Sequence, residues 1–261
     1  MKLTSKNGQY LKEIKYLRLY IISLAVAIIF SYSIYFFLDD TYVEDLGKED
    51  HLFENLTAVF LFLGSVLYFL SFNTSGRKYH FLFFMALLLF FGGGEEISWG
   101  QRIFHFNTPA NLKSMNVQRE TNIHNIEIFN HTNFDGTIKH GWHRLLEISF
   151  LFRIFCVLFG FVLPLCTFHL KPVNRLMRSL KVPIPPITIG IFFIFSWLAF
   201  RLTLAIIPKD RSVQYYDTAS EIFEFLSSYV LLLTAIYFYK NRKEDILGYD
   251  IKQYSNAILP K

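Results

Sequence analysis

The chain has 261 residues, enough for one or two folded domains, but its composition excludes most soluble and fibrous classes. Hydrophobic residues make up 52% of the chain and charged residues only 18%, whereas soluble domains carry about 25% charged residues. The net charge of +5 is small, and the apolar residues lie in long blocks. A disordered chain, a collagen-like chain and a disulfide-stapled secreted domain are therefore excluded. We predict an integral membrane protein.

Six apolar blocks approach or exceed the length of about 20 residues that a helix needs to cross a bilayer. We predict an all-α membrane bundle of six transmembrane helices, forming a single polytopic domain over residues 1–261. The third block is short, and we expect its helix to continue through GGGEEISWGQRIFHF with polar final turns. The first block is too long for the apolar part of a signal peptide and is expected to be retained. The predicted spans are 17–38, 52–72, 79–91 with its extension, 145–170, 184–207 and 222–239.

The distribution of lysine and arginine predicts the orientation of these spans, because cytoplasmic loops are enriched in both residues. The N-terminal segment, the second and fourth connections and the C-terminal tail carry 16 of the 26 basic residues but only four of the 21 acidic ones. We therefore predict that both termini are cytoplasmic, in a multi-pass protein of the cell (inner) membrane. The lipid bilayer is the expected partner, and no nucleic-acid partner is expected. The sequence does not indicate whether the protein is a monomer or an oligomer.

The longest connection, residues 105–144, joins the third and fourth spans on the predicted outer side and is called the outer segment below. Connections of this length are uncommon in the absence of a role. Five of the eight histidines lie in it: His105, His124, His131, His140 and His143. The search for function therefore concentrates on this side of the membrane.

Two carboxylates, Glu95 and Glu96, lie at the outer boundary of the third span. An ionisable group at that depth is a functional-site hypothesis by default. The C-terminal end of a helix disfavours negative charge, so a metal ion, an arginine or a proton has to stabilise the pair. On a continuous helix Glu95 would share a face with Arg102, and a structural ion pair is the alternative interpretation. The candidate catalytic residues are Glu95, Glu96, Gln101 and Arg102.

The stretch NVQRETNIHN is expected to form a short polar helix that begins near Asn116. On such a helix Glu120 and His124, four residues apart, would present two ligands to one divalent metal ion. An amide-rich stripe beside them indicates either a buried hydrogen-bond network or recognition of a polar ligand. The amides of this stripe are Gln118, Asn122 and Asn125.

Other spans bring charged groups to the same depth. Arg153 and Arg201 lie inside apolar blocks, where an unpaired arginine is costly. Either they pair with outer carboxylates, or one of them binds an anionic headgroup, since the guanidinium fork suits phosphate. The metal-ligand candidates are Glu95, Glu96, Glu120 and His124, with Glu54, Glu221 and Glu224 in reserve. The ligand-binding candidates are Gln118, Asn122, Asn125, Arg153 and Arg201.

The string GEEISWGQRIF at 94–104, followed by NVQRETNIHN at 116–125, resembles the signature of a family of bacterial polytopic membrane proteins of unknown function. Glu54 in the second span and Glu221 at the start of the sixth fit the same pattern. The resemblance implies a membrane protein in which the polar cluster is not incidental. It implies no reaction and no cofactor.

Three functions remain compatible with these features. The first is a metal-dependent enzyme at the extracytoplasmic interface, in which the metal activates water against a lipid-like or anionic substrate. The second is a non-enzymatic sensor or assembly factor that binds a ligand or partner through the outer segment. This reading is favoured by the absence of a GxSxG, HExxH, P-loop or GxGxxG motif. The third, an ion-coupled transporter, ranks last because the sequence shows neither a polar path across the membrane nor an inverted repeat.

Overall fold

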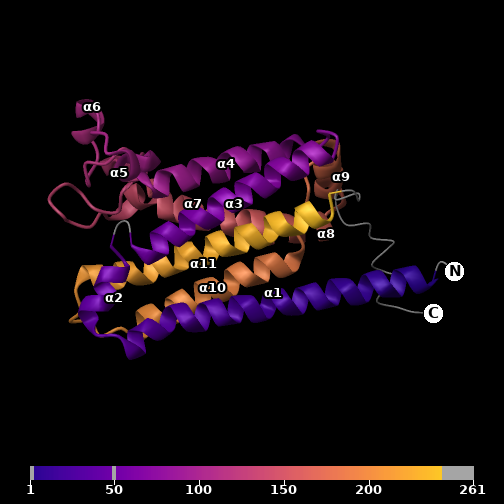
Figure 1. Ribbon diagram of the computed structural model, residues 1–261, viewed down its shortest axis with the longest axis horizontal. Coiled ribbons are helices and arrows are strands. Elements are labelled where there is room, and N and C mark those ends of the chain that lie inside the picture. The colour runs from indigo at the N-terminus through magenta and orange to yellow at the C-terminus, as the bar shows by residue number, and fades with distance from the viewer. Residues whose placement is uncertain (1–2, 49–50, 243–261) are drawn as a thin grey trace.

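A computed structural model describes residues 3–48 and 51–242, and within these ranges the chain is helical, with no β-strand. The long helices run side by side as a bundle (Figure 1). Five helices are long and apolar enough to cross a membrane, which confirms the all-α, multi-pass class. They are Arg18–Phe37 within α1 (Leu3–Phe37), α3 (Leu52–Thr74), Ile148–His169, α10 (Ile187–Ile206) and α11 (Val213–Lys240).

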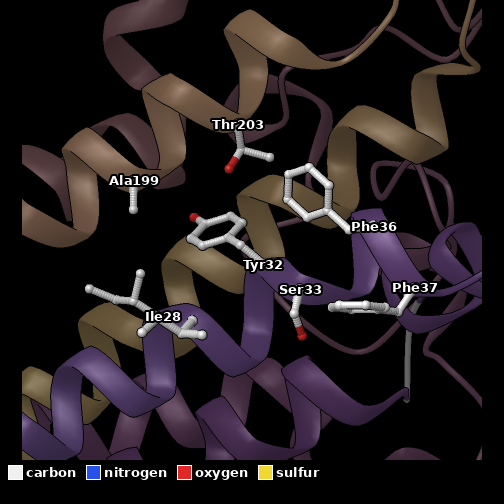
Figure 2. A pocket seen from close by; sticks show the side chains of 8 residues that line it. Ile28, Tyr32, Ser33, Phe36, Phe37, Ala199 and Thr203 are labelled. Atoms are coloured by element: carbon white, nitrogen blue, oxygen red, sulfur yellow. The ribbon is translucent and has the colours of Figure 1, made fainter.

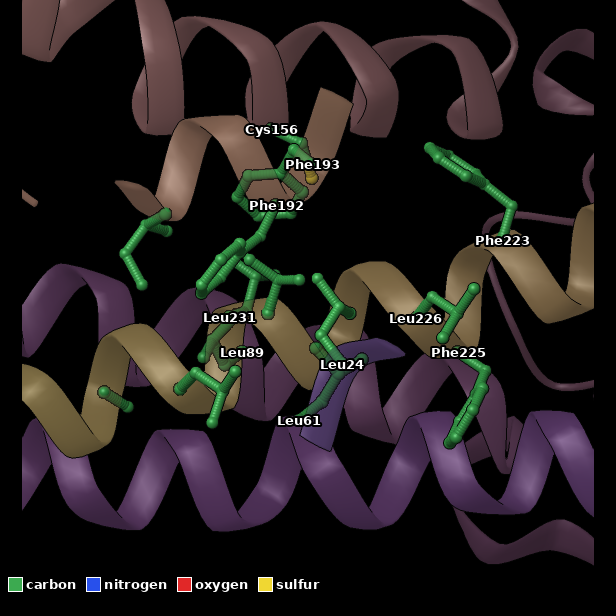
Figure 3. Packing of buried hydrophobic residues seen from close by; sticks show 14 of the residues in the cluster. Leu24, Leu61, Leu89, Cys156, Phe192, Phe193, Phe223, Phe225, Leu226 and Leu231 are labelled. Atoms are coloured by element: carbon green, nitrogen blue, oxygen red, sulfur yellow. The ribbon is translucent and has the colours of Figure 1, made fainter. Parts of the chain in front are cut away.

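Helix α11 forms the centre of the bundle. It lies between α3 and α10 (Figure 1) and packs against both. In its apolar stretch 72% of the residues are buried, against 22% in that of α1. Figure 3 shows Leu226 and Leu231 of α11 among the packed side chains of neighbouring helices, including Leu24, Leu61 and Leu89. The outer helices therefore expose apolar faces of the kind that a bilayer covers.

Helix α4 (His80–Glu96) lies along α3. The hydroxyl of Ser65 in α3 donates a hydrogen bond to the carbonyl of Ala86 in α4, at 2.7 Å. A β-carbon on Gly93 would lie 3.1 Å from the ring of Phe62, so the glycine lets this ring approach the α4 backbone. Small residues and interhelical hydrogen bonds of this kind hold helices together where lipid offers no hydrophobic drive for association.

The fourth apolar block contains an irregular turn where it crosses α10. The absent N–H of Pro164 removes the hydrogen bond to the carbonyl of Gly160, and the helix takes a π-helical turn there. Gly190 of α10 packs directly on this turn, because a β-carbon on it would lie 2.8 Å from the carbonyl carbon of Gly160. The segments of this block are α7 (Ile148–Val157), the π-helical turn (Leu158–Val162) and α8 (Leu163–His169).

The connections also contain short helices. Residues between α1 and α3 form α2 (Asp40–Leu46), which packs on the first turns of α11. There the Thr218 hydroxyl donates to the carbonyl of Val43 at 3.0 Å. Helix α9 (Lys171–Ser179) lies at the opposite end of the bundle from α2 (Figure 1). The end that carries α2 and the outer segment is called the loop end.

Two sequence-based predictions of helix are wrong. The third predicted helix does not continue through GGGEEISWGQRIFHF, because α4 ends at Glu96. NVQRETNIHN is not a helix but a loop closed by an isolated bridge between Asn116 and Ile126. The remaining short elements are the 3₁₀ turns Ser98–Gly100, Glu127–Phe129 and Gly141–Leu146, with α5 (Gln101–Phe104) and α6 (Ala110–Lys113).

Candidate functional site: a polar network at the end of α4

One residue beyond the end of α4, three consecutive residues have left-handed backbone angles. The φ values are 45° at Ser98, 55° at Trp99 and 78° at Gly100. Side-chain-bearing residues adopt this region only at a cost of about 1–2 kcal/mol each, so the surrounding contacts have to hold the turn in place. The turn redirects the chain away from the α4 axis. The sequence-based expectation of one continuous helical face from Glu95 to Arg102 therefore fails.

The turn folds Trp99 back over the last turn of α4. Its ring packs edge-on against Phe91, with ring centroids 5.5 Å apart. Gly94 lies directly beneath it, since a β-carbon there would be 3.0 Å from the indole ring. The indole Nε1 donates to Oε1 of Glu95 at 2.6 Å. The glycines of this stretch therefore serve close packing, and the helix breaks only after them.

Glu95 is the acceptor that ties the outer segment to α4. The residue is 5% exposed. Oε2 accepts hydrogen bonds from the backbone N–H groups of Ile123 at 2.5 Å and His124 at 2.9 Å, and Nδ1 of His124 lies 3.6 Å away. Together with Trp99, these donors suit an ionised carboxylate. They account for a negative charge at a helix end that disfavours it.

Asn116 organises the loop that contains Ile123 and His124, and its side chain is fully buried. Its Oδ1 accepts from the N–H groups of Gln118 at 3.0 Å and Glu120 at 3.1 Å, as a helix-capping residue would. No helix follows, because Arg119 takes a left-handed φ of 62°. Sequence reasoning identified Asn116 as a helix start and missed its central role in the loop.

A second set of bonds joins the two sequence motifs. Ser98 donates to Oε2 of Glu120 at 2.8 Å, and Asn122 donates to the Ser98 hydroxyl at 3.0 Å. Gln101 of α5 accepts from the backbone N–H of Thr121 at 2.7 Å. The predicted residues Gln101, Glu120 and Asn122 are thus brought together. The partners Ser98 and Thr121 follow only from the fold of the loop.

The amide network continues into the rest of the outer segment. Asn125 donates to Oε1 of Gln118 and accepts from Asn130 at 3.0 Å. Beyond it, residues 131–139 form a turn, in which Lys139 donates to the carbonyl of Asn130 at 3.1 Å. The hydroxyl and N–H of Thr137 bond Asp135 and hold the pKa of that carboxyl below its ordinary value. The amide stripe is expected to form a buried hydrogen-bond network or to recognise a polar ligand. The structure shows hydrogen bonds of the first kind.

The metal-ligand candidates are arranged differently from the expected helix. Glu120 and His124 do not share a helical face, and the carboxylate that lies 3.6 Å from the His124 ring is that of Glu95. Within residues 3–48 and 51–242, no three His, Cys, Asp or Glu side chains gather closely enough to hold a metal ion. Glu96 is partly exposed at the end of α4, and the side chain of Arg102 lies outside the described part of the structure.

The remaining candidates lie in the bundle. Glu54 is buried in the first turn of α3, and Glu221 and Glu224 are half-buried in α11. Arg153 is half-buried in α7, whereas Arg201 is exposed on α10. Among the described residues no ion pair joins either arginine to a carboxylate. The expected pairing of the arginines with outer carboxylates is therefore not found there.

Comparisons with known proteins assign neither a family nor a function to this chain. No protein-family model, no curated protein and no solved structure matches this chain. The resemblance of the two motifs to a family of bacterial membrane proteins stays a prediction.

Proposed function

We propose that this protein is a non-enzymatic membrane protein that binds a partner through the outer segment, which the polar network holds in a fixed shape. The observation that carries the proposal is the use of the motif side chains. Glu95, Asn116 and Asn122 bond the backbone and side chains of the chain itself. Such a network favours a defined loop conformation over chemistry on a substrate.

The outer surface of this segment supports binding. Large apolar side chains on it are exposed, up to 65% for Trp142. Exposed apolar side chains gathered on one segment are typical of an interaction site. A rigid segment also loses less conformational entropy on binding than a flexible one. The exposed apolar residues are Phe106, Met115, Ile123, Ile128, Phe134, Ile138 and Trp142.

The proposal includes six spans with both termini in the cytoplasm. Helix α4 has 17 residues, at the lower limit for a span, and at about 1.5 Å per residue covers about 26 Å. It runs beside α3, and basic α9 lies at the end opposite the outer segment. Impermeant thiol labelling of intact cells tests this, in a background lacking Cys156 and Cys166. Asn133→Cys should react and Ser179→Cys should not; the reverse pattern would contradict the orientation.

Photo-crosslinking tests the binding function. A benzophenone amino acid replaces Phe134 or Trp142 in the full-length chain, and Leu176 of α9 at the opposite end provides the control position. One discrete protein adduct should form from the two outer positions and not from Leu176. It should weaken when Glu95→Ala releases the loop. Lipid adducts alone, or identical adducts from all three positions, would refute the proposal.

A metal-dependent enzyme acting on a lipid-like or anionic substrate is the second candidate. The left-handed turn at Ser98–Gly100 favours it, since strained backbone concentrates at functional sites. Its ligands would come from Glu95, Glu96, Glu120 and His124. Elemental analysis of the purified protein separates the two candidates. Stoichiometric metal that disappears in Glu96→Ala and His124→Ala would replace the binding proposal with the enzyme.

A further inference from the structure

A cavity of about 380 Å³ lies between α7, α10 and α11. Its volume falls within the range of small-molecule sites. Figure 3 shows Cys156 beside Phe193, with Phe223 of α11 set apart from them. Apart from one cation, the side chains that line it are apolar, aromatic or a thiol. They include Arg153, Cys156, Val157, Phe193, Trp197 and Phe223.

The cation in this cavity is Arg153, five residues into α7 from its loop-end start at Ile148. No carboxylate among the described residues forms an ion pair with it. Glu224 of α11 is close enough to Cys156 to interact electrostatically with it, but it does not line the cavity. An uncompensated guanidinium inside an apolar span is costly. An anion supplied by a ligand would remove that cost.

The direction of α7 matters for which anion can reach Arg153. In a helix the Cα–Cβ bonds tilt toward the N-terminus, and the N-terminus of α7 lies at the loop end. The long side chain of Arg153 is therefore carried toward the headgroup region, as in other arginines that extend to the membrane surface. A phosphate at the lipid headgroup level can meet it while a fatty acyl chain follows the apolar wall.

Two features of the same bundle provide comparisons. The groove between α1 and α10, shown in Figure 2, has hydroxyl groups on Tyr32, Ser33 and Thr203 but no charged side chain. Arg201 lies five residues before the loop end of α10 at Ile206, just as Arg153 lies five residues from the loop end of α7. The N-terminus of α10 is at the opposite end of the bundle, so the Cα–Cβ bond of Arg201 tilts away from the loop end. Arg201 lines neither cavity.

We propose that the cavity between α7, α10 and α11 is a binding site for an anionic phospholipid, whose headgroup phosphate pairs with Arg153 and whose acyl chain lies against Val157, Phe193 and Trp197. The planar guanidinium donates two parallel hydrogen bonds to phosphate oxygens. A net negative headgroup leaves the pair neutral, which a zwitterionic lipid does not. This site is independent of the partner-binding function of the outer segment.

Native mass spectrometry of the full-length protein tests the site. The protein is extracted in mild detergent from vesicles of phosphatidylcholine with one quarter phosphatidylglycerol, and the retained lipids are counted. The wild type should keep one phosphatidylglycerol and no matching phosphatidylcholine, and excess inorganic phosphate should not displace it. Arg153→Gln should lower the retained phosphatidylglycerol about tenfold, the effect of one lost charged hydrogen bond. Equal retention of both lipids by the wild type would overturn the proposal.

Two further variants make the test independent of folding defects. Arg201→Gln removes a cation at the same number of residues from the loop end and should retain phosphatidylglycerol like the wild type. Val157→Trp keeps Arg153 but fills the cavity, and should lose the lipid while its thermal unfolding stays near that of the wild type. Retention by Val157→Trp, or equal losses in Arg153→Gln and Arg201→Gln, would show that the lipid binds elsewhere.

Discussion

The network at the end of α4 and the crossing of α7–α8 with α10 hold the chain together in opposite ways. At the end of α4, directed hydrogen bonds to Glu95 and Asn116 fix the loop, so the identity of each polar group matters. At the crossing, Gly160 and Gly190 bring two backbones together because neither has a side chain. The first region depends on particular hydrogen-bonding groups, and the second depends on the lack of side chains at Gly160 and Gly190. Substitutions should therefore act differently in the two regions.

The largest effect is expected at the crossing. Gly190→Ala places a methyl group against the carbonyl of Gly160, and a backbone cannot move aside as a flexible side chain can. We expect a loss of about 3 kcal/mol of unfolding free energy, measured by denaturant titration in detergent micelles. Gly92→Ala is the control, since its nearest new neighbour is the end of the Leu61 side chain at 3.3 Å. Equal stability of the two variants would contradict the close crossing.

Removing the carboxylate at the end of α4 should have the next largest effect. Glu95→Ala leaves the N–H groups of Ile123 and His124, which are partly buried, without their acceptor, at a cost of about 2 kcal/mol. Amide hydrogen exchange at these two residues should accelerate about 30-fold. Glu127→Ala, a carboxylate change in the same segment, should leave both rates unchanged. Unchanged exchange in Glu95→Ala would show that another group holds the loop.

Asn116→Ala should loosen the same loop to a smaller extent. The substitution removes the acceptor of the Gln118 and Glu120 N–H groups and the donor to Asn122. A cost of about 1–2 kcal/mol is expected, seen as faster limited proteolysis within the outer segment. Asn111→Ala, at an exposed position in α6, is the matched control. Proteolysis at the wild-type rate in Asn116→Ala would contradict the central role of this residue.

The smallest effect is expected from Trp99→Phe. The ring contact with Phe91 can persist, while the hydrogen bond to Glu95 is lost. Glu95 keeps its two backbone donors, so the loss of unfolding free energy should be about 1 kcal/mol. The melting temperature in detergent should fall by less than in Glu95→Ala. If the melting temperature fell further than in Glu95→Ala, the indole N–H would be the main stabilising group of the turn.

The structure separates residues that the sequence treats alike. Arg153 and Arg201 both lie in apolar blocks, each five residues from the loop end of its helix, but the rotation and direction of their helices place only Arg153 in a cavity. Glu120 and His124 have the spacing of helical metal ligands, yet the chain forms no helical turn between them. Residue spacing predicts proximity only where the backbone is regular, and here it is not.

By itself, the sequence determined the class of this protein, since long apolar blocks are compatible only with helices whose backbone groups bond internally within a membrane. It also marked the two motifs at 94–104 and 116–125 as the polar centre of the chain. Only the tertiary structure decided how these motifs meet, because the left-handed turn at Ser98–Gly100 and the hydrogen bonds to Glu95 join residues more than twenty positions apart. Such contacts form only when the loop closes in three dimensions, and the local pattern of apolar and polar residues does not predict this closure.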